Sequence, residues 1–96
     1  MRNVYLVCYD ICDERRVKRV YKTMRGFGDH LQLSVFRCEL SPRERAEMIA
    51  AVAPIIDRDV DQVLIVDIGP TDGRAAEVFA TLGRPYVQPE RHAVVI

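Results

Sequence analysis

The residues with the clearest chemical potential lie near the start of the chain, where an aspartate ends an apolar run. Asp10 follows directly after residues 4–9, which are apolar without interruption. A carboxylate at the end of a strand can bind a hard cation such as Mg²⁺, which keeps most of its waters and often takes one or two protein carboxylates beside phosphate oxygens. A loop or capping aspartate is the alternative interpretation of Asp10.

A run of cations follows Asp10 within residues 15–25. Val17, Val20, Tyr21 and Met24 recur there at the spacing of one helical face, so the basic side chains must share the solvent side. In a chain with a net charge of zero, such a stripe predicts contact with a nucleic-acid backbone. The alternative is a solvated helix face. The predicted nucleic-acid-binding residues of this segment are Arg15, Arg16, Lys18, Arg19, Lys22 and Arg25.

Length and composition limit the remaining choices. The chain has 96 residues, 49% hydrophobic and 29% charged, so we expect one folded domain over residues 1–96. Cys8, Cys12 and Cys38 form an odd set without CxxC spacing, which predicts buried free thiols in a cytoplasmic protein. The longest apolar stretch, residues 48–56, is too short for a membrane span and contains Pro54. No membrane partner is expected.

The elements that must position these residues can be read from the pattern. Residues 4–9 predict a strand buried on both faces, and Asp13 is a candidate N-cap for a helix that Gly26 and Gly28 stop. Residues 29–40 predict one long bent strand or a tight pair of strands.

A second helix is expected after residue 41. Residues 41–44, Ser-Pro-Arg-Glu, form a capping box with proline at the first helical position. The buried stripe of this helix is predicted to be Ala46, Ile49, Ala53 and Ile56. Residues 63–66 predict a further core strand. The acids around that strand, namely Asp57, Asp59, Asp61 and Asp67, are interpreted as solvated turn residues without chemistry.

This element order predicts an α+β protein with a ferredoxin-like βαββαβ sandwich, in which two helices lie on one face of an antiparallel sheet. The core is expected over residues 3–68. A tail of about residues 71–96 would contain a turn at 71–73, a short helix over residues 74–82 and a strand at 92–96. Because two helices cover only one face, a second copy is expected on the other, with the terminal strand crossing to the partner. The alternative is that the tail folds back over its own sheet.

Several motifs together resemble the signature of the small CRISPR-associated family usually written Cas-two. The similarity covers residues 3 to about 68, and the combined motif is far more specific than any one part. It comprises Tyr9-Asp10-Ile11, then Arg15, Arg16, Lys18 and Val20, then Gly28, Gln32, Ser34-Val35-Phe36 and Leu40.

The resemblance implies a sheet-to-sheet homodimer with shared C-terminal strands, a partnership with the CRISPR integrase in spacer acquisition, and binding of RNA or DNA. Some members of the family are Mg²⁺-dependent endonucleases, and Mn²⁺ is a candidate substitute. A non-catalytic adaptor between the integrase and prespacer DNA is the alternative function.

The resemblance also implies roles for individual residues. Asp10 becomes the metal ligand at the dimer seam, and Arg16 and Arg19 match functional arginines of the family. Ser34 and Phe36 occupy positions near the same cleft and complete the predicted catalytic set. His30 stands where some relatives have an arginine, and we expect it to contact nucleic acid.

Overall fold

The computed structural model describes residues 1–85, without the side chains of residues 76 and 77. Its elements follow the expected order, and the segment 29–40 is a pair of strands. They are β1 (Asn3–Asp10), α1 (Glu14–Met24), β2 (Asp29–Gln32), β3 (Val35–Leu40), α2 (Pro42–Val52), β4 (Gln62–Pro70) and the short 3₁₀ helix η1 (Arg74–Glu77).

Both helices begin where the sequence predicts. The Asp13 side chain accepts a hydrogen bond from the Arg16 backbone N–H at 3.0 Å. At α2, the Ser41 hydroxyl accepts from the Glu44 N–H, and the Glu44 carboxylate accepts from the Ser41 N–H. These caps satisfy backbone donors that the first turn leaves unpaired, so they fix where each helix starts.

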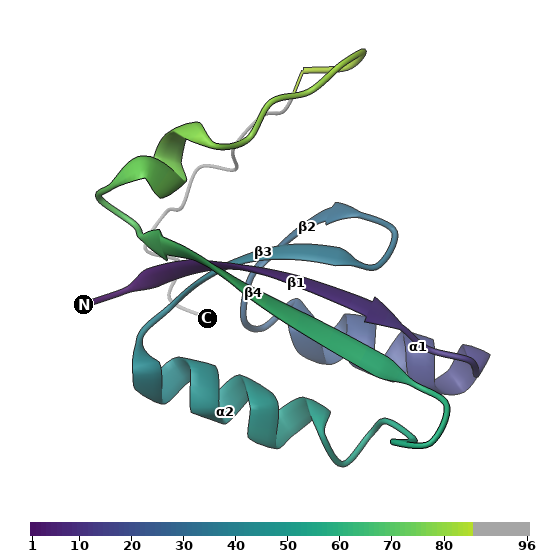
Figure 1. Cartoon of the computed structure of the whole chain (residues 1–96). Helices are drawn as coiled ribbons and strands as arrows, with labels where there is room; N and C mark the ends of the chain where they lie inside the picture. Colours follow the sequence, from purple (N-terminus) through teal and green to yellow (C-terminus); the bar gives the residue numbers. More distant parts are fainter. Residues whose placement is uncertain (86–96) are drawn as a thin grey trace.

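The four strands form one sheet in the order β2-β3-β1-β4, with every neighbouring pair antiparallel. Both helices lie on the same face of this sheet (Figure 1). The ferredoxin-like prediction is therefore confirmed. β1 is central and pairs with a strand at each edge, and Tyr5, Val7 and Tyr9 face the core. The prediction that it is buried on both faces is not met within this chain, because Leu6 and Cys8 on the other face are only half-buried.

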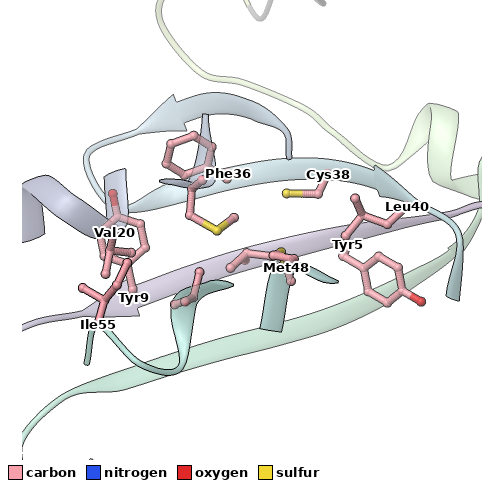
Figure 2. Packing of buried hydrophobic residues seen from close by; sticks show 11 residues of the cluster. Tyr5, Tyr9, Val20, Phe36, Cys38, Leu40, Met48 and Ile55 are labelled. Atoms are coloured by element: carbon pink, nitrogen blue, oxygen red, sulfur yellow. The ribbon is translucent and has the colours of Figure 1, made fainter. Parts of the chain in front are cut away.

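The core lies between the sheet and the two helices. Tyr5, Val7 and Tyr9 point into it from β1, and Phe36 and Met48 are among its largest fully buried side chains (Figure 2). A Cβ on Gly28 would lie 2.4 Å from the Cys38 sulfur, so this close packing excludes any larger residue there.

The predicted stripe of α2 is wrong in its first half, since Ala46 and Ile49 are exposed. Met48 and Val52 are buried in their place. The physical reason is area: a helix rotated to bury Met48 removes more apolar surface from water than one that buries Ala46.

The other face of the sheet lies opposite the helices, and we call it the open face. Side chains alternate along a strand, so Leu6, Cys8 and Asp10 project from β1 onto this face. Leu64 and Val66 join them from β4, and they remain 52% and 41% exposed. This apolar surface is what a second copy was expected to cover.

Residues 71–85 reach only one end of the open face. Ala75 in η1 is buried, and the Phe79 ring centroid lies 5.8 Å from the Arg37 guanidinium carbon. The turn at 71–73 is confirmed, whereas the helix ends at Glu77 and is shorter than predicted. The expected strand at 92–96 lies outside the described residues.

The thiols are not all buried: Cys38 is, Cys8 is half-buried and Cys12 is exposed. Among residues 1–85, no helix has the length and apolar character needed to cross a membrane.

Candidate metal and nucleic-acid site

Asp10 lies at the exposed end of β1, where the strand leaves the sheet. It pairs with Gln62 at the start of β4, and its side chain belongs to the open face. The backbone N–H of Tyr9, the preceding residue, donates to the Ser34 carbonyl at 3.0 Å. The structure therefore brings Asp10 and Ser34 to the same end of the sheet, as the predicted site requires.

The donor set at this position fits Mg²⁺ only in part. No group of three or more His, Cys, Asp or Glu side chains able to hold a metal ion is found within residues 1–85. One chain thus offers the exposed carboxylate of Asp10, and further ligands must be water, phosphate oxygens or a second copy. Mg²⁺ tolerates such a site because it is often bound through one or two carboxylates.

Five of the six cations in residues 15–25 form an exposed stripe along α1 and its C-cap residue, Arg25. These are Arg15, Lys18, Arg19, Lys22 and Arg25. Lys18 lies 3.4 Å from Glu14, one turn earlier in the helix, and this exposed pair contributes little in water. The stripe begins near the Asp10 end of the sheet but lies on the helix side. At a rise of about 1.5 Å per residue, Arg25 is roughly 15 Å further along the helix than Arg15.

Arg16 differs from these five because its guanidinium is bound within the protein. Its Nε donates to the Asp61 Oδ2 at 2.7 Å, and its Nη2 donates to the Asp61 Oδ1 at 3.2 Å. The Asp61 side chain is fully buried, whereas the Arg16 side chain is 26% exposed. The interpretation of Asp61 as a solvated turn residue is therefore wrong.

The partners of Asp61 hold its pKa far below the usual range for aspartate. The hydrogen bonds from the Arg16 side chain are the largest cause, and the backbone N–H groups of Cys12 and Asp57 add to it, while burial opposes them. The same pairing raises the pKa of Arg16. At neutral pH the two groups are a charged, hydrogen-bonded pair.

This pairing predicts a specific pH dependence of stability. Because the folded-state pKa of Asp61 is depressed, its stabilisation is complete above the unfolded pKa of about 3.9 and is lost as pH falls below that value. Thermal unfolding of wild type and Asp61→Asn should show a gap in Tm that is constant from about pH 7 to 5 and narrows below about pH 4. Glu47→Gln, which removes only a surface contact with Arg43, should leave Tm nearly unchanged. A gap that does not vary with pH would contradict this account.

Phe36 is placed in the core and not at a surface. It is fully buried, its ring stacks on Tyr9 with centroids 6.2 Å apart, and it meets Tyr21 edge to face at 5.8 Å. A ring in this position cannot stack on a base, so a direct catalytic or binding role for Phe36 is not supported. Its contacts instead fix Tyr9, the residue before Asp10.

His30 remains accessible at the edge of this aromatic group. Its side chain is exposed on β2, and its ring lies 5.0 Å from Tyr21 in an edge-to-face arrangement. Its Nε2 is 2.8 Å from the Leu33 carbonyl oxygen in the hairpin turn. The role of His30 in nucleic-acid binding stays a prediction.

Asp61 is the residue near the site that the sequence analysis missed. Three other acids lie within ten positions of it, and nothing in their types separates it from them. Its spacing could have done so: Val63 and Ile65 of β4 pack against the core, and Asp61, just before β4, continues the same alternation. The run 63–66 is apolar throughout, however, so the sequence does not reveal which parity faces inward.

Comparisons with known proteins agree with this arrangement. A sequence model of the family described as CRISPR associated protein Cas2 matches residues 3–75. The CRISPR-associated endoribonuclease Cas2 1 of Rhodospirillum rubrum is 40% identical over 94 residues, which cover 98% of this chain and 91% of the relative. The CRISPR-associated endoribonuclease Cas2 of Geobacter sulfurreducens is 41% identical over 96 residues and is covered completely, as is this chain.

Solved structures show the same similarity. The crystal structure of Streptococcus pyogenes Cas2 at pH 6.5 has a TM-score of 0.71 and 29% sequence identity, covering 83% of this chain and 99% of that one. A crystal structure described as that of cas2 has a TM-score of 0.73 and 27% identity, covering 95% and 98%. Because the family model matches residues 3–75 and relatives covered over 91% or more of their length are about 40% identical, the chain belongs to the CRISPR-associated Cas2 family.

Proposed function

We propose that this protein acts in CRISPR adaptation as a homodimer that holds nucleic acid and hydrolyses phosphodiester bonds at a site built on Asp10. The observation that carries this proposal is the position of Asp10, an exposed carboxylate at the rim of an apolar sheet face. The relatives at about 40% identity are named endoribonucleases, which supports RNA as a substrate.

The open face supports the dimer. Leu64 and Val66 are about half exposed beside Leu6 and Cys8, and a contiguous apolar patch of this kind is typical of a surface that another protein covers. A twofold pairing is isologous, so each copy would contribute the same residues. Two Asp10 carboxylates at the rim of one interface would then share the cation that a single chain binds poorly.

The residues of this chain would divide the chemistry between them. Asp10 from each copy would hold Mg²⁺, and the ion, when bound, would polarise a phosphoryl oxygen and lower the pKa of a bound water. Arg15 lies in the first turn of α1, at the end nearest to Asp10, and Arg19 lies about one turn further along the helix. Both would bind backbone phosphates. Ser34 would contact substrate beside Asp10.

A second candidate function is a structural adaptor that joins the CRISPR integrase to prespacer DNA without cleaving it. The scarcity of catalytic groups favours it: within residues 1–85 the site offers one acid per chain and no cluster able to bind a metal alone. The exposed stripe of α1 would hold duplex DNA equally well in either function.

The substitution Asp10→Ala tests the two functions against each other. If Asp10 holds the catalytic ion, its loss should remove ~3 kcal/mol or more of transition-state stabilisation, so Mg²⁺- or Mn²⁺-dependent cleavage should fall at least about 100-fold. Cleavage of single-stranded RNA and of duplex DNA should be measured over a range of pH. Spacer acquisition with the integrase present should be measured in parallel.

The control is Asp72→Ala, which removes an exposed acid from the 71–73 turn and should leave cleavage unchanged. Loss of cleavage with intact acquisition would assign the adaptor role in the cell and leave hydrolysis as a separate activity. If the wild type cleaves neither substrate at any pH or metal concentration, the nuclease proposal is wrong.

A further inference from the structure

The buried carboxylate of Asp61 binds both the loop that follows Asp10 and the turn before β4. The Asp61 side chain is fully buried, and both of its oxygens accept two hydrogen bonds. Oδ1 accepts from the Cys12 N–H at 2.9 Å and from the Arg16 Nη2 at 3.2 Å. Oδ2 accepts from the Arg16 Nε at 2.7 Å and from the Asp57 N–H at 2.8 Å. Such complete satisfaction is what allows a charged group to remain buried.

The groups that Asp61 gathers come from two separate parts of the chain. Cys12 lies in the loop between β1 and α1, two residues after Asp10, whereas Asp57 lies in the turn before β4. The Cys12 sulfur adds a 3.0 Å contact to the Val60 carbonyl oxygen in that same turn. The loop that leaves Asp10 is thus fastened to the segment that leads into β4.

Asp10 is held from the strand side as well. Its ladder partner on β4 is Gln62, the residue directly after Asp61. The backbone at Asp10 is therefore fixed by strand pairing on one side and by the Asp61 carboxylate, through Cys12, on the other. Shifting the 11–13 loop requires breaking these buried hydrogen bonds, which resists motion of the Asp10 carboxylate.

This geometry also explains why Arg16 stands apart from the other cations of α1. Its Nε and Nη2 both bind Asp61 side-on, an arrangement that uses the planar fork of a guanidinium. A phosphate that displaced Asp61 from Nε and Nη2 would leave a buried carboxylate without its charge partner, which is strongly unfavourable. The remaining nitrogen, Nη1, lies 3.9 Å from the Asp13 Oδ2, so it also faces an acid of the protein. Arg19, one turn further along α1, is exposed and free of this conflict.

We infer that Asp61 and Arg16 form a positioning pair, which holds the 11–13 loop so that Asp10 presents its carboxylate to the metal and substrate. Arg16 then acts through Asp61, and it does not contact the nucleic acid. This inference rests on the proposed role of Asp10 in hydrolysis. The structural part of it, the restraint on the loop, can be measured without any cleavage assay.

Binding measurements separate this role from phosphate contact. The affinity for a single-stranded RNA oligonucleotide should be measured as a function of salt for Arg16→Ala, Arg16→Lys and Arg19→Ala. The logarithm of the binding constant K falls linearly with the logarithm of the salt concentration. Each lost phosphate contact reduces the magnitude of this slope by about 0.7 for a single strand. We expect Arg19→Ala to reduce the magnitude of the slope by about this amount and Arg16→Ala to leave it unchanged. A slope change for Arg16→Ala equal to that of Arg19→Ala would overturn the inference.

Hydrogen exchange measures the restraint directly. In Arg16→Ala and in Asp61→Asn, the Cys12 amide should exchange at least about 10-fold faster than in wild type, while amides in the centre of β1 should stay protected. If Asp61→Asn folds poorly, Arg16→Lys still tests whether the pair restrains the loop. It keeps the charge but lacks the fork, so it should behave like Arg16→Ala. An unchanged Cys12 amide in Arg16→Lys and Arg16→Ala would overturn the inference.

Steady-state kinetics of cleavage test the effect of this pair on function. We expect Arg16→Ala and Arg16→Lys to lower kcat about 10- to 100-fold with KM changed less than about 2-fold, and Arg19→Ala to raise KM. The double variant Arg16→Ala/Asp61→Ala should be no slower than either single variant, because the two residues act as one unit. If the wild type cleaves nothing, the proposed function fails, and the salt slopes and the Cys12 exchange rate still decide whether the positioning pair exists.

Discussion

Replacing Leu64 with glutamate is expected to convert the proposed dimer to a monomer, with the dimer dissociation constant raised at least about 1000-fold. Leu64 lies in β4 on the open face and is 52% exposed in the single chain. A twofold interface contains each substituted residue twice, once from each copy, so two carboxylates would be buried against apolar surface. Lost apolar burial and the cost of dehydrating these charges should together exceed ~4 kcal/mol.

The matched control for this variant is Leu33→Glu. Leu33 is 91% exposed in the hairpin turn between β2 and β3, away from Leu64 and Val66, so the same chemical change should leave the dimer intact. Sedimentation equilibrium gives the mass of each variant over a range of protein concentrations. If Leu64→Glu stays dimeric with an unchanged dissociation constant, the two copies do not meet through the open face, and a metal ion shared by two Asp10 residues loses its basis.

The helix starts and the strand order were predictable because short-range chemistry determines them. Asp13 and Ser41 satisfy backbone donors within three residues, so their function as caps needs no knowledge of the tertiary structure. Gly28 was predicted only as part of the helix stop, and the close approach of Cys38 that admits no side chain there is a tertiary contact. The uninterrupted apolar runs of residues 4–9 and 63–66 then specified core strands, and connection rules left few topologies.

The role of Arg16 was not predictable for the opposite reason. It pairs with Asp61, 45 residues away, and both residue types are common on surfaces. In sequence, Arg16 differs in no way from Arg15 or Arg19, and all three belong to one charged run. Only the packing of α1 against the turn before β4 turns one guanidinium inward. The burial of Phe36 is a similar case, because its alternating strand does not show which side faces the helices.

The exposed cations of α1 are the part of the site with the largest expected effect on binding. Arg15, Arg19 and Lys22 follow one another at helical spacing, so they lie on one face of α1. Reversing all three to glutamate should weaken binding to duplex DNA at least about 1000-fold at moderate salt. It should also reduce the magnitude of the slope of log K against log salt by about 2.7, since each of the three contacts contributes about 0.9.

A second triple variant tests whether the change in net charge alone accounts for such a loss of binding. Arg43, Arg74 and Arg84 are exposed, and they lie outside α1 and outside the turn before β4 that packs against it. Reversing these three to glutamate changes the net charge by the same amount. We expect that variant to bind with a slope close to that of wild type, because the counterions released on binding come from phosphates that meet the stripe. Fluorescence anisotropy over a salt series measures both quantities. Equal losses in the two triple variants would mean that long-range charge, and not the stripe on α1, attracts the nucleic acid.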